Sequence, residues 1–96
     1  HWVAVYYDNN GKVYFDSYGL LPLDNRIEKF CGEGFVYNNV QLQDLYSDAC
    51  GFYCVYFILK RARGEDTENI VYYLNRIKDS DSFVKHFIRN QYKCLF

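Results

Sequence analysis

Two short apolar segments near the start of the chain are separated by polar turn residues. Residues 2–7 and 12–16 are both rich in β-branched and aromatic residues, as strands are. Between them lies Asp8-Asn9-Asn10-Gly11, and its Asn-Gly pair supplies the positive φ angles that a tight hairpin turn requires. The pattern therefore predicts an antiparallel hairpin.

The next apolar pattern has the spacing of a helix. Leu23, Ile27 and Phe30 recur at i, i+4 and i+7, which predicts a short amphipathic helix that ends before Gly32. Residues 35–42 then predict a third strand.

The most distinctive segment runs from residue 49 to residue 59 and is apolar on nearly every side of a helix. A helix of this kind must be buried all round, so we expect it to be the core helix of the domain. Ser47 or Asp48 would cap its start. Gly64 would end it, because glycine readily adopts the left-handed conformation that commonly follows a helix.

Two further amphipathic helices are expected at about residues 66–77 and 81–91. Their candidate caps are Asp66 or Thr67 for the first helix and Ser80 or Asp81 for the second. The order of elements predicts an α+β fold, with a small antiparallel sheet packed against a buried central helix and a helical C-terminal part.

Length and composition restrict the class of protein. The 96 residues suffice for a single domain, residues 1–96, and aromatic residues make up 21% of them, unlike in disordered chains. A net charge of −1 creates no overall field that would attract nucleic acid. The longest apolar run, Val55–Leu59, is far shorter than the roughly 20 residues that cross a membrane. We therefore expect a soluble globular domain that does not bind membranes.

Four cysteines stand at positions 31, 50, 54 and 94, without the short paired spacing of a zinc site. We interpret them as reduced, and we expect an intracellular protein with no metal and no cofactor. Because the chain begins with His1 and contains no Met, we also expect it to be processed or to be a core cut from a longer chain.

Cys50 stands at the expected start of the central helix, where unpaired N–H groups and the positive end of the helix dipole converge. That environment favours the thiolate, which is the reactive form of the side chain. The competing interpretation is a core residue, since free cysteines are among the most buried residues. Cys54, one turn further into the apolar stretch, fits the competing interpretation better.

A cysteine nucleophile needs a base and a group that orients the base. His1 precedes the first strand and Asp16 ends the second, so a tight hairpin would bring the two side chains together. Asp16 would then accept from one imidazole nitrogen and leave the other nitrogen for the thiol. Asp8, in the turn at the far end of the hairpin, is too distant for this role. Taken singly, a terminal histidine or a strand-end aspartate is equally an ordinary surface residue.

Acyl transfer also needs hydrogen-bond donors for the developing oxyanion. Gln43 lies seven residues before Cys50, and its side-chain amide could point at the same oxygen as the Cys50 backbone N–H. Gln41 is the competitor, because strand alternation would place it on the same face as Gln43.

The order and spacing of these residues resemble the adenovirus protease (adenain) family of cysteine proteases. The resemblance rests on His1-Trp2, on Phe15-Asp16-Ser17-Tyr18-Gly19, and on Gln43 with six residues between it and Cys50-Gly51. Similar proteases occur in Polinton/Maverick-type elements and related viruses. The wider clan also holds the SUMO- and ubiquitin-like-protein proteases, which usually have one residue fewer between Gln and Cys.

The resemblance implies an adenain-like fold and a Cys-His-Asp endopeptidase without a cofactor. In that reading Cys50 is the nucleophile, His1 the general base, Asp16 its orienter and Gln43 the oxyanion donor. The substrates would be viral or element-encoded precursor proteins, and the place of action would be the host nucleus or the virion.

Two partners follow from the family resemblance alone: an activating peptide and DNA. Adenovirus protease is activated by a peptide that forms a disulfide, but the surroundings of Cys31 do not align cleanly with that cysteine. The basic residues Lys85, Arg89 and Lys93 could contact DNA, although a solvated basic face is the simpler interpretation.

Three alternatives remain open at this point. The first is a protease specific for SUMO or ubiquitin-like proteins, and the second is a catalytically inactive protease fold that binds a partner. A zinc-binding module is the weakest alternative. Cys50 and Cys54 share a helix face, but His86 and Cys94 lack the spacing that would join them in a motif.

Overall fold

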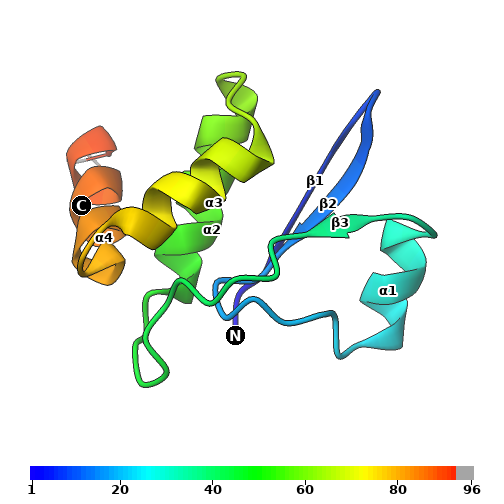
Figure 1. The fold of residues 1–96 in the computed structure, drawn as a ribbon, viewed down its shortest axis with the longest axis horizontal. Coiled ribbons are helices and arrows are strands. Elements are labelled where there is room, and N and C mark those ends of the chain that lie inside the picture. Colours follow the sequence, from blue (N-terminus) through cyan, green and yellow to red (C-terminus); the bar gives the residue numbers. More distant parts are fainter. Residues whose placement is uncertain (93–96) are drawn as a thin grey trace.

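A computed structural model describes residues 1–92 of the chain. Its elements, in chain order, are β1 (Ala4–Asp8), β2 (Gly11–Phe15), α1 (Asn25–Cys31), β3 (Val36–Tyr37), α2 (Cys50–Ala62), α3 (Thr67–Arg76) and α4 (Ser80–Gln91). Figure 1 shows α2, α3 and α4 gathered on one side of the small sheet, with α1 at its other end. The predicted α+β class is confirmed.

The predicted hairpin is present, but its turn differs in detail. β1 and β2 pair antiparallel, from Ala4 opposite Phe15 to Asp8 opposite Gly11. The positive φ falls on Gly11, at 127°, and not on the two turn residues. The backbone N–H of Asn10 donates to the carboxylate of Asp8 at 2.8 Å, so a side chain helps to close the turn.

The third strand is shorter than the sequence predicted, and it runs in the other direction. Instead of residues 35–42, only Val36–Tyr37 form β3, which pairs parallel to β2 in a sheet of order β1-β2-β3. The expected antiparallel sheet is therefore mixed. A parallel pair needs a long crossover, and here the connection contains α1. The strand ends because Asn39 adopts a left-handed φ of 51°.

Helix α2 is the central helix of the core, as predicted. Tyr53, Cys54, Tyr56 and Phe57 are buried, and the Phe57 ring stacks on Phe15 of β2 with centroids 4.4 Å apart. The helix packs against β1, α3 and α4.

The prediction that α2 is buried on every side is wrong along one edge. Val55 and Ile58 are 40% and 43% exposed. The sheet, α3 and α4 pack on the other faces of the helix, and no element within residues 1–92 covers this edge.

The shorter helices agree with the predicted positions, with differences at their ends and faces. α1 forms, but Leu23 and Phe30 of its predicted stripe are 93% and 47% exposed. α3 begins after Asp66, one of its two predicted caps. The cap of α4 is neither Ser80 nor Asp81 but Asp79, whose carboxylate accepts from the backbone N–H of Ser82.

Within residues 1–92, none of the helices has the length and apolar character that crossing a membrane would require.

Candidate active site

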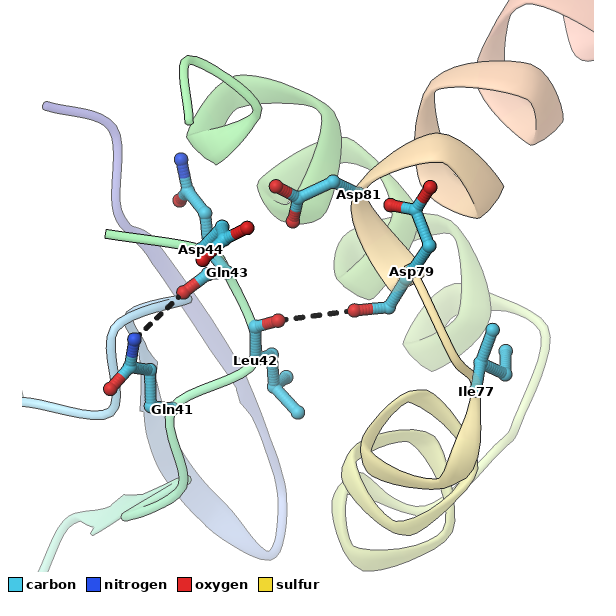
Figure 2. Close-up of a pocket in the computed structure, with 8 residues that line it drawn as sticks. Gln41, Leu42, Gln43, Asp44, Ile77, Asp79 and Asp81 are labelled. Carbon is cyan, nitrogen blue, oxygen red and sulfur yellow. Dashed lines mark hydrogen bonds between the residues drawn. The ribbon is translucent and has the colours of Figure 1, made fainter. Parts of the chain in front are cut away.

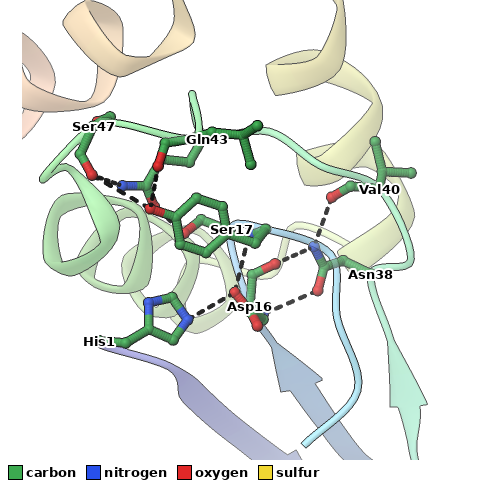
Figure 3. Close-up of polar contacts among 9 residues, drawn as sticks. His1, Asp16, Ser17, Asn38, Val40, Gln43 and Ser47 are labelled. Atoms are coloured by element: carbon green, nitrogen blue, oxygen red, sulfur yellow. Dashed lines mark hydrogen bonds and ion pairs between the residues drawn. The ribbon is translucent and has the colours of Figure 1, made fainter.

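The hairpin brings His1 and Asp16 together, as its register requires. Nε2 of His1 lies 3.0 Å from Oδ1 of Asp16, and the same oxygen accepts from the backbone N–H of Tyr18 at 2.9 Å. The Asp16 side chain is 5% exposed and that of His1 40%. The imidazole also stacks on the Tyr18 ring, with centroids 5.1 Å apart. Figure 3 shows the His1 imidazole with one nitrogen directed at Asp16 and its second nitrogen, Nδ1, turned away from it.

The backbone of Asp16 is held by a residue that the sequence analysis missed. The buried side chain of Asn38 accepts from the Asp16 N–H at 3.0 Å and donates to the Asp16 carbonyl at 2.7 Å. Its amide nitrogen also donates to the carbonyl of Val40 at 3.1 Å (Figure 3). Asn38 thus clamps the end of β2 to the segment after β3. The Asn-Asn pair after an apolar run was the only sequence signal for such a turn.

Gly19 closes the turn that follows Asp16, and no other residue fits there. Its N–H donates to the Asp16 carbonyl at 2.7 Å. Its φ is 76°, and a Cβ atom at this position would lie 2.5 Å from the Val40 carbonyl carbon. The turn therefore depends on both the conformational freedom and the small size of glycine.

Burial raises the pKa of the Asp16 carboxyl above its ordinary value, and the hydrogen bond from the Tyr18 N–H partly offsets this effect. Burial dominates because a carboxylate loses solvation when it leaves water. The ionised form needs its two donors, and one of them is His1.

Cys50 is the first residue of α2 and is half-buried. Ala49, which precedes it, is buried, and its N–H donates to the Ser47 hydroxyl at 3.0 Å. Ser47 thus orders the approach to the helix, although the N-cap position belongs to Ala49 and not to Ser47 or Asp48 as predicted. The first N–H groups of a helix have no partner within it, so they face the surroundings of the Cys50 thiol.

One contact joins the segment that carries His1 to the segment that carries Cys50. The ring of Trp2 lies against Gly51, where a Cβ atom would be 3.7 Å from the ring, so the residues that follow His1 and Cys50 touch. The segments that begin β1 and α2 are therefore neighbours.

Gln43 is buried next to the same region, with 1% of its surface exposed. Its Oε1 accepts from the Ser17 hydroxyl at 2.5 Å, and its Nε2 donates to the Ser47 carbonyl at 2.9 Å (Figure 3). A side-chain amide carries two N–H donors, so one donor remains for a ligand. The sequence did not predict that Ser17 and Ser47 contact Gln43.

The comparison of Gln41 with Gln43 by strand alternation was wrong, because no strand forms there. Gln41 is exposed, and its Nε2 donates to the Gln43 carbonyl at 3.0 Å. Burial and hydrogen bonding therefore favour Gln43 as the predicted donor.

A pocket of about 320 Å³ lies between residues 41–44 and the start of α4 (Figure 2). It is lined by three acidic side chains, those of Asp44, Asp79 and Asp81. Two of them have structural partners. The Asp79 carboxylate caps α4, and Asp81 accepts from the hydroxyl of Tyr53 at 2.5 Å. These contacts account for two of the three acidic side chains.

The remaining cysteines have a structural explanation. Cys31 and Cys54 are buried, and burial raises the pKa of both thiols, that of Cys54 to about 12. Neither they nor Cys50 form a disulfide in the described part of the chain. Residues 1–92 hold no cluster of three or more potential metal ligands. Lys93 and Cys94, which entered the DNA and zinc expectations, lie outside the described residues.

Comparison with known proteins adds one related sequence. The chain is 35% identical over 104 aligned residues to a protein of Acanthamoeba polyphaga mimivirus named "Putative thiol protease". The match supports a cysteine protease. It covers 95% of this chain but 34% of the mimivirus protein, so the chain spans about a third of the length of this relative. No family model and no solved structure matches the chain.

Proposed function

We propose that the chain is the catalytic core of a cysteine endopeptidase similar to the adenovirus protease. The observation that carries the proposal is the 3.0 Å contact between His1 Nε2 and the buried Asp16, in a chain whose Cys50 is the first residue of α2. An imidazole oriented by a carboxylate beside a cysteine at a helix start is the arrangement that activates a thiol. The name of the mimivirus relative supports the same class of enzyme.

The first half of the reaction forms an acyl-enzyme. His1 takes the proton of the Cys50 thiol on Nδ1, and Asp16 holds the resulting imidazolium through Nε2–H. The thiolate adds to the scissile carbonyl carbon, and the oxyanion accepts from the Cys50 N–H and the free amide N–H of Gln43. As the C–N bond breaks, His1 returns the proton to the leaving amine.

The second half releases the acyl group. Water replaces the amine, and His1 removes a proton from it as the water attacks the thioester. The tetrahedral intermediate collapses, the C–S bond breaks, and the thiol of Cys50 is regenerated. Asp16 touches neither substrate nor thiol in this scheme, so it is a positioning residue.

The substrates that we propose are precursor proteins encoded by a virus or a mobile element, processed inside the host cell. The mimivirus source of the relative supports a viral setting. Proteases specific for SUMO or ubiquitin-like proteins use the same group of residues, so only substrate profiling separates the two. Incubation with a panel of viral precursor fragments and ubiquitin-like precursors, analysed by mass spectrometry of the products, assigns the substrate class.

The test of the proposal is alkylation with iodoacetamide across a pH series, with each modified cysteine located by mass spectrometry. We expect Cys50 to react at least about tenfold faster than Cys54 below the pH at which free thiols ionise, ~8.5. His1→Ala should remove that advantage, because the imidazole no longer accepts the thiol proton. Equal reactivity of Cys50 in the parent chain and in His1→Ala would contradict the proposed pairing.

The role of Asp16 has its own readout. Asp16→Asn should lower kcat by about tenfold or more with little change in KM, because the histidine loses its preferred tautomer and the imidazolium loses its carboxylate. The acid limb of the pH profile should also move, since the variant has no carboxyl group to titrate. An unchanged profile would assign Asp16 a purely structural role, and full turnover by Cys50→Ala would show that Cys50 is not the nucleophile.

A further inference from the structure

Ser17 carries a buried hydroxyl group that the proposed mechanism does not use. Its side chain is completely buried, and its hydroxyl donates to Oε1 of Gln43 at 2.5 Å. Its main chain has a separate role, because the Ser17 carbonyl accepts from the backbone N–H groups of Leu42 and Gln43, at 2.8 Å and 3.0 Å. Any residue at position 17 could supply that carbonyl, so the tie between the two segments does not explain the serine side chain.

The two contacts of the Gln43 amide allow only one orientation. Nε2 donates to the Ser47 carbonyl at 2.9 Å, and a carbonyl oxygen can only accept. A flipped amide would place Oε1 against that carbonyl, and two acceptors cannot form a hydrogen bond. The Ser17 hydroxyl fits the observed orientation, because it can donate to Oε1 (Figure 3). Ser17 and Ser47 therefore hold the amide by its oxygen and its nitrogen.

The same contacts connect the amide to the start of α2. The Ser47 hydroxyl accepts from the N–H of Ala49 at 3.0 Å, and Ala49 directly precedes Cys50. A hydrogen bond donated to an amide oxygen also polarises the amide and strengthens its N–H groups as donors. One N–H of Nε2 is used by Ser47, and the proposed reaction assigns the second one to the oxyanion.

We propose that Ser17 is a positioning residue of the reaction: its hydroxyl fixes the orientation of the Gln43 amide and strengthens the N–H that binds the oxyanion. The inference rests on the proposed peptidase function. Ser17 touches neither the substrate nor the thiol in the proposed scheme, so its effect passes through Gln43. The negative charge that this N–H stabilises develops in the transition state, so the hydroxyl should affect kcat more than KM.

The experiment measures kcat and KM for a peptide that the parent chain cleaves, selected from a random peptide library. Ser17→Ala removes the hydroxyl and keeps the backbone carbonyl. We expect kcat to fall about five- to tenfold while KM stays within about twofold, because the amide loses one of its two partners. Ser17→Cys keeps a weak donor of similar size, so its kcat should lie between those of the parent and Ser17→Ala.

Ser80→Ala is the matched control. The Ser80 hydroxyl is also buried, and it donates at 3.1 Å to the carbonyl of Leu42, the residue before Gln43. Its other partner is the Tyr53 hydroxyl, so it does not bind the Gln43 amide. Both substitutions should lower the midpoint of urea unfolding, because each removes a buried hydrogen bond. Only Ser17→Ala should lower kcat, and Ser80→Ala should stay within about twofold of the parent.

A double-mutant cycle tests whether Ser17 acts through Gln43. Gln43→Ala should lower kcat by about a hundredfold, because it removes an oxyanion donor. In the Gln43→Ala background, Ser17→Ala should have no further effect on kcat, since the group on which Ser17 acts is gone. Ser17→Cys replaces Ser17→Ala in the cycle if the alanine variant does not fold.

The outcomes separate the two proposals. If the parent chain cleaves the peptide but the substitution of Ser17 lowers kcat equally with and without the Gln43 amide, the Ser17 inference is wrong and the peptidase proposal stands. The same conclusion follows if a folded Ser17 variant loses no more kcat than Ser80→Ala does. If the parent chain cleaves no peptide of the library, both proposals fail.

Discussion

The first and second turns of α2 contain the same chemical group in two different surroundings. Cys50, in the first turn, is half-buried, and the next residue, Gly51, lies against the ring of Trp2, which follows His1. Cys54, four residues later, is 5% exposed among core residues, and burial raises its pKa to about 12. The core therefore keeps the Cys54 thiol protonated and inert, whereas Cys50 is only half-buried.

The difference shows where the polar and apolar parts of the fold meet. The start of α2 follows a hydrogen-bonded polar segment, in which the buried Gln43 donates to the Ser47 carbonyl and the Ser47 hydroxyl accepts from the Ala49 N–H. The second turn belongs to the hydrophobic core, where Phe57 of α2 stacks on Phe15. Buried polar groups keep their positions only while their partners are in place, so the first turn depends on residues that the second turn does not need.

The largest effect expected is on turnover, and it separates the two cysteines. Cys50→Ala should reduce kcat by about a thousandfold or more, because the nucleophile is lost. Cys54→Ala should keep turnover within about threefold and cost about 1 kcal/mol of stability through the small cavity it leaves. Steady-state kinetics and urea unfolding of both variants make the measurement. A severe loss of turnover in a folded Cys54→Ala chain would contradict the prediction that only Cys50 is needed for turnover.

The next effect concerns the turn that supports the first turn of α2. Gly19→Ala should lower the free energy of unfolding by about 3 kcal/mol, the sum of a strained positive φ and a clash with the Val40 backbone. Gly34→Ala is the control, because Gly34 has nearly the same φ, 74°, with open space around it. It should cost about 1 kcal/mol. Equal losses in the two variants would show that the clash relaxes freely.

A smaller effect is expected where the second turn is tied to the rest of the chain. The hydroxyl of Tyr53 lies 3.1 Å from the Leu42 carbonyl and 2.6 Å from the Ser80 hydroxyl. Tyr53→Phe should cost about 1–2 kcal/mol of unfolding free energy, because buried partners lose a hydrogen bond. Tyr56→Phe should be close to neutral, since the Tyr56 hydroxyl makes no hydrogen bond to the described residues. An unchanged free energy of unfolding in Tyr53→Phe would show that these hydrogen bonds do not stabilise the fold.

The smallest effect is a change of stability with pH. Burial raises the folded-state pKa of Asp16, so the folded chain holds that proton more tightly than the unfolded chain does. The parent should therefore lose stability relative to Asp16→Asn as the pH rises from the ordinary Asp range through the raised pKa. Urea unfolding of both chains at about pH 3.5 and pH 7 measures the difference.

Asp48→Asn gives the control of opposite sign. The Lys85 ammonium lowers the pKa of Asp48, so its contribution to stability is present above the ordinary Asp pKa and is lost as the pH falls through the lowered one. The stability of the parent relative to Asp48→Asn should therefore increase as the pH rises. The same sign in both comparisons would mean that another group dominates the pH dependence.

Much of the local structure was predictable because it depends on neighbours in the sequence. The apolar run from residue 49 and the stop at Gly64 identified α2, which ends at Ala62 with Gly64 at a φ of 92°. The polar turn between two β-rich segments identified the hairpin. Because the register of a tight hairpin follows from its turn, the meeting of His1 with Asp16 was predictable as well.

Other parts of the site depend on contacts between distant segments. Asn38 was not predicted, because its role exists only once β3 lies beside β2. Strand alternation could not separate Gln41 from Gln43, since the backbone there is held by Ser17 and not by a strand. The roles of His1, Asp16, Gln43 and Cys50 in catalysis stay predictions.

The sequence by itself determined the helices, the hairpin and the presence of a base, a carboxylate, an amide and a thiol in the right order. Periodicity and turn chemistry act over a few residues, so they can be read without knowing the fold. Tertiary structure alone decided the parallel pairing of β3, the burial of Asp16 and Gln43, and the open edge of α2 at Val55 and Ile58. Burial depends on which segments pack together, and no local pattern contains that information.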